Sequence, residues 1–485
     1  MTDTRAQPAA KNPGRLKPGR VGGTWAPAGF SWSLFEFARN PYYMLVVIYV
    51  FAPYFSKEVA GGGVEGSATV ADVITWSGVI CACTAPFLGV LMDRGGRRKP
   101  LLGFFLAVIS ICAIALWWST PTGGLGVGWT VALLVLAFCS YTYSEVMHNA
   151  MLPAAGRPEA LPHISGAGLA LGNLGAVIGL LVVAAATLQP QLFGFDVAAH
   201  DPERFTGPYA GVWMAVFVIP FFLFMPDGAV AGGTWRAAAG DLLGLRQNKG
   251  FNPAERVRRL RTYVRDLFSK SPDTMRFLIG RMIYADGLAA VLTLGGVYTA
   301  TFLGWSGLET ALYGVYGSVF AAFGGLMGGA LDQRFGAKRA ILIELSITMA
   351  VIVIQLSITP DALFFGLIPA GHTVLPGPVF NSLADVTYLG FIALIAMSLT
   401  ACISSSRYML VAVAPKGRVG EFFGFYAMAA TLTVWMGPAL YAFFARAFDD
   451  QRIGMASLLI LFVVGLGVLM TVKHDGRARA EAPAG

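Results

Sequence analysis

Residues 89–99 read GVLMDRGGRRK, and residues 328–339 read GGALDQRFGAKR. Both stretches place a glycine four residues before an aspartate, and both continue with basic residues. The two aspartates, Asp93 and Asp332, are 239 residues apart, which is about half of the 485-residue chain. Because each stretch directly follows a long apolar run, the sequence predicts a chain built from two duplicated, membrane-embedded halves.

The chain is too apolar for a soluble protein. Hydrophobic residues make up 56% and charged residues 13% of the sequence, against roughly 45–50% and 25% in ordinary soluble domains. A membrane-spanning helix needs about 20 apolar residues. The sequence therefore predicts an all-α membrane protein with twelve transmembrane helices, over residues 31–55, 72–92, 101–120, 129–151, 164–187, 209–225, 275–301, 311–331, 341–359, 386–406, 422–444 and 456–472.

Basic residues lie mainly on one side of these spans. Of the 35 Lys and Arg residues, 28 fall in the two tails and the loops that share their side, four fall in the loops of the other side, and three fall within spans. Cytoplasmic loops carry the excess of positive charge. We therefore expect both termini in the cytoplasm and a multi-pass protein of the inner (plasma) membrane of a bacterium. No cleaved signal peptide is expected, because the polar first 24 residues hold no small-residue cleavage site.

The longest polar stretch divides the spans into two sets of six. Apolar residues within it recur at helical spacing among arginines, which predicts an amphipathic helix on the membrane surface or, alternatively, a solvated basic linker. The stretch 360–385 is apolar but broken by Pro and Gly, and we expect an interfacial or re-entrant segment there. The predicted organisation is a cytoplasmic tail (1–28), a six-helix bundle (29–226), a cytoplasmic linker (227–273), a second six-helix bundle (274–473) and a cytoplasmic tail (474–485).

The 89–99 stretch resembles the signature loop of the major facilitator superfamily, and the 328–339 stretch lies where that superfamily has its second copy. The resemblance covers nearly the whole chain. It implies two pseudo-symmetric six-helix bundles that move a small-molecule substrate by alternating access. Further segments resemble the vacuolar-effluxer-like branch, which is named for an autophagy-related amino-acid effluxer: EFARNPYY (36–43), YVFAPYF (49–55), NAMLP (149–153), SGAGLALG (165–172), YADG (284–287) and PKGRVGEFFG (415–424). Amino acids or short peptides are the substrate class that this branch implies.

Polar side chains inside the predicted spans are the candidate site. An ionisable group at mid-membrane costs roughly 2.5–3.5 kcal/mol, so such residues are rare and usually face a cavity or a partner. We expect substrate binding and proton coupling to involve Glu36, Arg39, Asn40, Glu145, His148, Asn149, Arg281 and Asp286.

The spacing of these residues leaves alternatives open. Glu36 and Arg39 share a helix face. They either neutralise each other as an ion pair or have separate roles, in which Arg39 binds a substrate carboxylate or phosphate and Glu36 takes up and releases a proton. Glu145 and His148 repeat that spacing, as a proton relay or a structural pair. Since the seventh and first helices are symmetry mates in the superfamily, we expect Asp286 to face Arg39 across the cavity.

The two duplicated loops have a conformational role by resemblance. In the superfamily the loop carboxylate meets the positive N-terminus of a neighbouring helix and the adjacent arginines, which closes the cytoplasmic side. Topology-setting charge alone explains the arginines but not the Gly–Asp spacing. We expect Glu344 to pair with the nearby 334–339 basic cluster. The implied gate consists of Gly89, Asp93, Arg94, Arg97, Arg98, Asp332 and Arg334.

The sequence carries no nucleotide-binding loop, metal cluster or nucleophile–base motif, so we expect no enzyme, no cofactor and no metal. The expected partners are a small-molecule substrate, protons and the lipid bilayer, and no nucleic acid. Two alternatives to an amino-acid or peptide transporter stay open. One is a cation-coupled sugar or glycoside symporter, which EFARN (36–40) faintly resembles. The other is a non-transporting membrane scaffold or sensor, although the charges retained inside the spans weigh against it.

Overall fold

The computed structural model describes residues 26–94, 98–157, 160–227, 258, 262, 265–415, 422, 425, 426 and 433–474, and only the backbone of 85–94, 153, 161–163 and 166. Helices dominate. The first half contains α1 (Pro27–Pro41), η1 (Tyr42–Tyr49), α2 (Phe51–Tyr54), η2 (Phe55–Val59), α3 (Gly63–Arg94), α4 (Lys99–Ala115), η3 (Leu116–Trp118), α5 (Gly126–Met151), η4 (Leu152–Ala154), α6 (Leu161–Leu188), α7 (Pro190–Phe193), α8 (Asp201–Phe217) and α9 (Ile219–Phe224). The second half contains α12 (Pro272–Thr301), α13 (Gly307–Phe335), α14 (Ala337–Leu356), β1 (Ala362–Leu363), β2 (Ile368–Pro369), α15 (Leu383–Val413), α17 (Met436–Phe448) and α18 (Gln451–Met470).

Ten helical segments of the described chain are long and apolar enough to cross a membrane. They cover ten of the twelve predicted spans. The first predicted span is instead a series of shorter segments, α1, η1, α2 and η2. The eleventh is described only at 422, 425 and 426 and from 433 onward, and it ends in α17. The chain is therefore a multi-pass integral membrane protein, and every predicted span contains helix.

The first span departs from a regular α-helix after Pro41. Pro41 ends α1, the next eight residues form the π-helix η1, and the N–H of Val50 then donates to the carbonyl of Leu45 (3.1 Å). Short π-helical stretches are frequent at functional sites. The carbonyl of Ile48 in η1 lies so close to Gly296 of α12 that a Cβ there would collide with it. Through η1, the first span touches the second half of the molecule.

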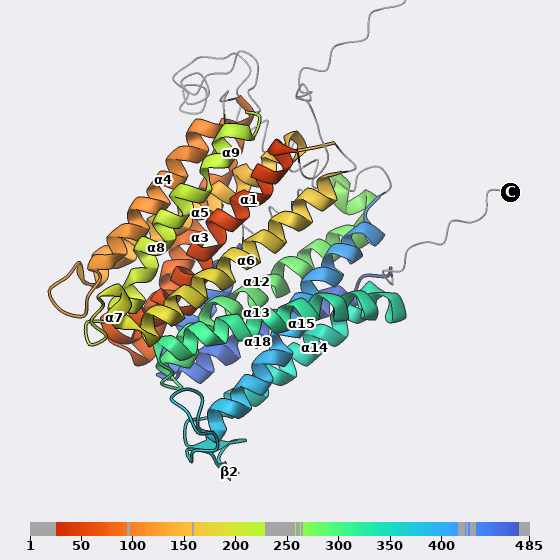
Figure 1. The fold of residues 1–485 in the computed structure, drawn as a ribbon. Helices are drawn as coiled ribbons and strands as arrows, with labels where there is room; N and C mark the ends of the chain where they lie inside the picture. Colours follow the sequence, from red (N-terminus) through yellow and green to blue (C-terminus); the bar gives the residue numbers. More distant parts are fainter. Residues whose placement is uncertain are drawn as a thin grey trace, which may run out of the picture.

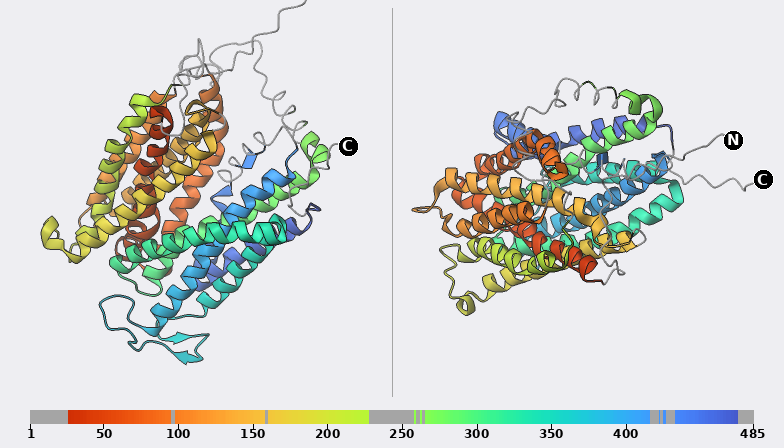
Figure 2. Two further views of the ribbon diagram at one scale, coloured as in Figure 1. Left: turned by 45° about the vertical axis from the view of Figure 1, so that its right-hand side comes forward. Right: turned by 90° about the horizontal axis from the view of Figure 1, so that it is seen from above.

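The helices form two bundles with the same internal packing (Figures 1 and 2). In the first half α4 packs on α5 and α8, and in the second half α14 packs on α15 and α18. The left view of Figure 2 shows the two bundles joined at one end and splayed apart at the other. The predicted tails and the linker, with its amphipathic helix, fall largely outside the described residues, so the domain boundaries stay predictions.

Up to residue 382, the stretch 360–385, expected to be an interfacial or re-entrant segment, lies outside the ten helical segments that could cross a membrane. It forms a small hairpin in which β1 and β2 pair antiparallel, with one further bridge between Thr373 and Ser382. Figure 1 shows this hairpin projecting beyond the ends of α14 and α15. The Pro and Gly residues prevent a helix, and backbone groups without helical partners are tolerated only away from the hydrocarbon.

Ion pairs connect the bundles at their joined end. Arg446 of α17 lies 2.7 Å from Asp72 and 3.1 Å from Glu65, both of α3. Nearby, the ring of Tyr49 in η1 meets the ring of Tyr313 in α13 edge to face, with centroids 5.1 Å apart. Within the described part of the chain, the pairs of Arg446 are the only ion pairs that join the two bundles. They stabilise the conformation that is closed at this end.

We expect Arg446→Ala to shift the equilibrium toward the conformation that is open at this end. The pairs are partly exposed, so their loss is worth about 1 kcal/mol, or about a fivefold change in population. The measurement is the distribution of distances between two spin labels at the splayed end, one near the last residue of α9 and one near the first residue of α14. The short-distance population should grow.

Arg452→Ala serves as the matched control, because Arg452 pairs with Asp450 at the start of its own helix, 3.0 Å away. The control should leave the distance distribution unchanged. If Arg446→Ala leaves it unchanged as well, the contact between α17 and α3 does not hold the joined end closed.

Candidate functional site

Four of the ionisable residues predicted for the site lie together between α1 and α5. Arg39 Nη2 is 2.9 Å from Glu36 Oε2, and Arg39 Nη1 is 3.3 Å from Glu145 Oε2. His148 Nδ1 is 3.2 Å from Glu36 Oε1. Glu145 and His148 therefore do not pair with each other, as their spacing suggested, but each pairs with a residue of α1. We call these four residues the charge network.

The charge network is buried at Arg39 and His148, partly buried at Glu36 and exposed at Glu145. The side chain of Arg39 is 5% exposed and that of His148 is fully buried, whereas the side chain of Glu145 is 48% exposed. An unpaired charge at this depth is costly, and mutual pairing offsets that cost. Glu145 is therefore the most accessible member of the charge network.

The imidazole of His148 is fixed by aromatic and backbone contacts. The rings of Trp32 and Phe35 both stack on it, with centroids 4.1 Å away. The indole N–H of Trp32 donates to the carbonyl of His148 (3.0 Å), and His148 Nε2 lies 3.0 Å from the carbonyl of Trp32. These contacts place Nδ1 3.2 Å from Glu36 Oε1, where it makes no hydrogen bond of good geometry. Phe35 was not among the predicted site residues, because one apolar ring in an apolar span does not stand out from its neighbours.

Aromatic rings also surround Arg39. Its guanidinium carbon lies 4.4 Å from the centroid of the Tyr141 ring, within cation–π distance. Tyr43, the second residue of η1, stacks on Tyr141 at 5.3 Å. Arg39 Nε and Nη1 make no hydrogen bond of good geometry with the described residues. Arg39 therefore keeps donors that a ligand can use.

Close packing of α6 on α1 positions the charge network. A Cβ on Gly175 would lie 2.7 Å from the carbonyl of Phe37, and a Cβ on Gly172 would lie 3.2 Å from Glu36 Cβ. The amide of Asn40 lies beside the same glycine, 3.3 Å from that Cβ position. The predicted Asn40 thus lies against α6, whereas Asn149 is exposed next to His148, in the last turn of α5.

The two candidates on α12 lie apart from the charge network. The Arg281 guanidinium lies over the Tyr426 ring (3.6 Å) and donates to the Tyr426 carbonyl (2.9 Å). Asp286 Oδ2 accepts from the backbone N–H of Gly437 (2.9 Å), in the first turn of α17. The expected pairing of Asp286 with Arg39 is therefore wrong for this conformation. The positive end of α17 binds one oxygen of Asp286, and Arg39 already has two acidic partners.

The first duplicated loop is described only in part. Arg98 donates from Nη1 to the carbonyl of Ala150 at the end of α5 (3.1 Å), and its backbone N–H donates to Asp227 Oδ1 (2.8 Å). Asp227 follows α9, so this contact ties three helix ends of the first bundle together. The side chains of the other predicted gate residues of this loop lie outside the described residues: Gly89, Asp93, Arg94 and Arg97.

The second duplicated loop departs from its prediction. Asp332 is buried near the end of α13, whereas Arg334 is exposed and lies over the Phe335 ring (5.3 Å). Glu344 was expected to pair with the 334–339 basic cluster, and that expectation was wrong. Glu344 is fully buried and accepts a hydrogen bond from Ser405 of α15 (3.0 Å), because it lies two turns into α14, on the face that packs against α15.

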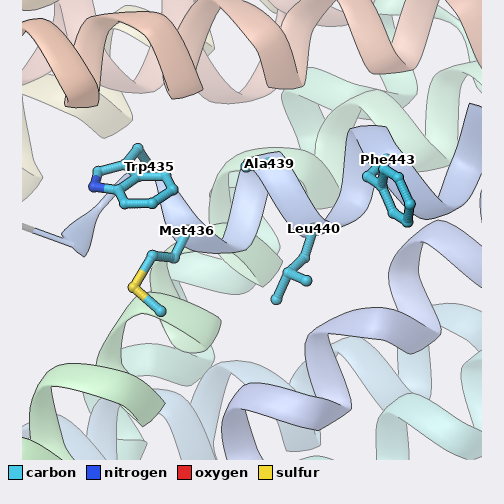
Figure 3. A pocket seen from close by; sticks show the side chains of 5 residues that line it. All are labelled: Trp435, Met436, Ala439, Leu440 and Phe443. Carbon is cyan, nitrogen blue, oxygen red and sulfur yellow. The ribbon is translucent and has the colours of Figure 1, made fainter.

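A hollow of about 280 Å³ lies along α17, and Figure 3 shows the side chains that line it: Trp435, Met436, Ala439, Leu440 and Phe443. This lining is almost wholly apolar and suits apolar groups rather than a charged ligand. Within the described residues, no group of three His, Cys, Asp or Glu side chains is placed to hold a metal ion. The charge network is thus the candidate site.

Two helical bundles with repeated packing, joined at one end and splayed at the other, agree with the class that the comparisons give, a membrane transporter of the major facilitator superfamily. A family model described as "Vacuole effluxer Atg22 like" matches residues 58–482. The chain belongs to this family, and the resemblance inferred from the sequence is confirmed.

Relatives agree with this assignment. The chain is 25% identical over 451 residues to an uncharacterized MFS-type transporter, YxiO, of Bacillus subtilis (strain 168), covering 92% of this chain and 94% of that relative. It is 21% identical over 323 residues to autophagy-related protein 22 of Cryptococcus neoformans var. neoformans serotype D (strain B-3501A), covering 66% of this chain and 54% of that relative.

Solved structures share the fold at low sequence identity. A D-xylose–proton symporter matches with a TM-score of 0.63 at 11% identity, over 93% of this chain and 98% of the symporter. A peptide transporter, POT, in complex with sulfate matches with a TM-score of 0.62 at 15% identity, over 95% of this chain and 98% of the transporter. These likenesses establish the all-α architecture of the superfamily.

We expect Gly175→Ala to destabilise the protein, because the added methyl group pushes α6 away from the Phe37 carbonyl of α1. The expected loss is about 1–3 kcal/mol. The measurement is thermal unfolding of the purified protein in detergent. Gly325→Ala on α13 is the control, since a Cβ at Gly325 meets nothing within 4 Å. Equal unfolding temperatures for both variants would contradict the proposed tight contact between α1 and α6.

Proposed function

We propose that this protein is a proton-coupled secondary transporter that moves a small polar or anionic metabolite by alternating access, with an amino acid or a short peptide as the expected substrate. The proposal rests on the charge network, which combines a site for a proton with a cation for a carboxylate. The first and fourth spans, which supply the network, line the central cavity in the superfamily that this chain resembles.

The observation that carries the proposal is the contact between Glu36 and His148. The carbonyl of Trp32 accepts from His148 Nε2, so Nε2 bears a hydrogen. In a neutral imidazole, Nδ1 is then an acceptor, and it faces a Glu36 carboxylate oxygen 3.2 Å away. Two acceptors repel each other at this distance. The contact is favourable only with a proton between the two groups, on one or the other.

Arg39 supports the anionic substrate. Its partner Glu145 is half-exposed and approaches at 3.3 Å, so this ion pair is the weaker of the two that Arg39 makes. A substrate carboxylate that replaced Glu145 would accept a hydrogen bond from Arg39 Nη1. The Tyr141 ring would keep the planar guanidinium in position for this contact. Release of Glu145 would in turn change the charge balance around Glu36 and His148, which links substrate binding to the proton.

The direction of opening follows from the charges of the loops. The helix ends at the splayed end are those to which the basic tails and loops of the sequence attach, so we place this end in the cytoplasm, together with both termini, in the inner membrane of a bacterium. The state seen here is then open toward the cytoplasm, and the ion pairs of Arg446 close the opposite side. Rocking of the two bundles about η1 and its contact with α12 would exchange the two states.

The substrate class is testable by thermal-shift screening of the purified protein against amino acids, short peptides, organic acids and sugars at two pH values. A ligand present at 100 times its Kd stabilises the protein by about 2.7 kcal/mol, which is readily detected. We expect stabilisation by carboxylate-bearing compounds and its loss in Arg39→Ala. Arg452→Ala is the control and should keep the response.

A stabilising sugar, or a carboxylate whose effect does not depend on Arg39, would contradict the anionic site. A sugar response would favour the cation-coupled sugar symporter. The absence of any small-molecule response at both pH values would favour the scaffold or sensor.

Proton coupling is tested with Glu36→Gln in proteoliposomes, using a compound identified by the screen. Without the carboxylate, the proton between Glu36 and His148 loses its acceptor. We expect accumulation driven by a pH gradient to fall at least tenfold, while exchange of substrate for substrate persists. Glu309→Gln is the control, because Glu309 is a half-buried residue that caps the start of α13, outside the charge network. Undiminished pH-driven accumulation in Glu36→Gln would remove Glu36 from the coupling mechanism.

A further inference from the structure

A second group of ionisable residues lies in the other bundle, outside the charge network. Asp332 comes from the end of α13, Glu344 from α14 and Ser405 from α15. Glu344 is fully buried and Asp332 is 9% exposed. Glu344 Oε2 and Asp332 Oδ1 are buried without a hydrogen-bond partner among the described residues. Two carboxyl groups with free oxygens in one buried place need either a cation or a proton.

The packing of α13 on α15 explains why these residues meet. A Cβ on Gly328 would lie 2.9 Å from the carbonyl of Ala401, so the absence of a side chain allows the two helices to lie in close contact. Asp332 and Ser405 follow one turn later on their respective helices, at the same level. The Gly–Asp spacing of the 328–339 stretch therefore delivers the Asp332 carboxyl to the Ser405 hydroxyl.

The described cations nearby are engaged elsewhere or exposed. On the Asp332 side, the guanidinium of Arg334 lies over Phe335. On α14, Lys338 donates to the carbonyls of Met470 and Val472, and Arg339 is exposed.

The remaining packed helices supply no described cation either. On α12, Arg281 binds the carbonyl of Tyr426. On α15, Arg407 is exposed, and the neutral side chain of Cys402 is the other titratable group beside the two carboxyls. At the end of α18, the carbonyl of Met470 accepts a hydrogen bond from Lys338, so this cation is engaged there.

The hydrogen bonding of the Ser405 hydroxyl indicates how the negative charge of the two carboxyls is compensated. It donates to Glu344 Oε1 (3.0 Å), and its side chain interacts with Asp332, which lies at the same level on α13. A hydroxyl has one hydrogen and cannot donate to two carboxylates at once. Its oxygen can, however, accept a hydrogen bond from a protonated Asp332. Close carboxylates in a place of low polarity do not both ionise.

We propose that Asp332 and Glu344 form a second proton-binding site, bridged by the Ser405 hydroxyl, and that they share one proton in this conformation. The site lies beside the second duplicated loop, in the bundle that does not hold the charge network. Movement of that loop, which carries Asp332 at its start, would separate the two carboxyls and release the proton. The second bundle thereby contributes its own proton-dependent element to the conformational cycle.

The test is infrared spectroscopy of the full chain in lipid, without substrate, titrated with pH. We expect a carbonyl band of a protonated carboxyl that disappears in the Asp332→Asn, Glu344→Gln double variant. In each single variant the remaining carboxyl has lost its acidic neighbour, so its band should titrate away at lower pH than in the wild type. Glu309→Gln is the matched control and should leave the band and its titration unchanged.

Three outcomes would overturn the proposal. Retention of every protonated-carboxyl band in the double variant would mean that both groups are ionised. Single variants that titrate like the wild type would mean that the carboxyls do not share a site. A band that is absent in sodium chloride and emerges in choline chloride would identify a sodium site instead.

Thermal unfolding provides a second measurement, including for variants that express poorly. Stability from a proton held in the folded state is present at low pH and is lost as the pH rises. The unfolding temperature of the wild type should therefore fall further between neutral and alkaline pH than that of Asp332→Asn. An equal fall in both proteins would count against the site. A Glu36→Gln variant should keep the infrared band, so the outcome is independent of the function proposed for the charge network.

Discussion

The cost of holding charge inside a membrane shapes this protein more than any other constraint. Four ionisable side chains between α1 and α5 are tolerated because Arg39 lies between two carboxylates and His148 contacts Glu36. Such a set is stable only while its members stay close. Any event that displaces one of them, whether a proton, a substrate carboxylate or a movement of α1, changes the energy of the rest.

Close backbone contacts keep the charge network in place. The glycines of α6 allow α1 to lie against it, and the aromatic pair Trp32 and Phe35 fixes the imidazole. Beyond Pro41 the chain becomes a π-helix, and this segment makes the contact with α12 and α13 of the other bundle. The span that carries Glu36 and Arg39 is thus also a span on which the two bundles meet, so charge and bundle movement are connected through one helix.

The two bundles repeat their packing but not their chemistry. In the first bundle an arginine compensates the buried carboxylates. In the second bundle the described arginines point elsewhere, and Asp332 and Glu344 meet at a serine. Asp286 finds its partner in the backbone N–H of Gly437, at the positive end of α17. Duplication therefore preserved the helix arrangement, while the charged positions diverged between the halves.

Composition and periodicity determined the class, the spans and the repeat, because the bilayer sets helix length and polarity and these are local properties of the chain. The family followed from motifs such as GVLMDRGGRRK (89–99). Helical spacing also predicted the pair Glu36–Arg39, since residues three apart share a face. The partners of Glu145, His148, Asp286 and Glu344 were decided only by the tertiary structure. Each of them reaches to another helix, and no spacing within one helix determines which face of a neighbour packs against it.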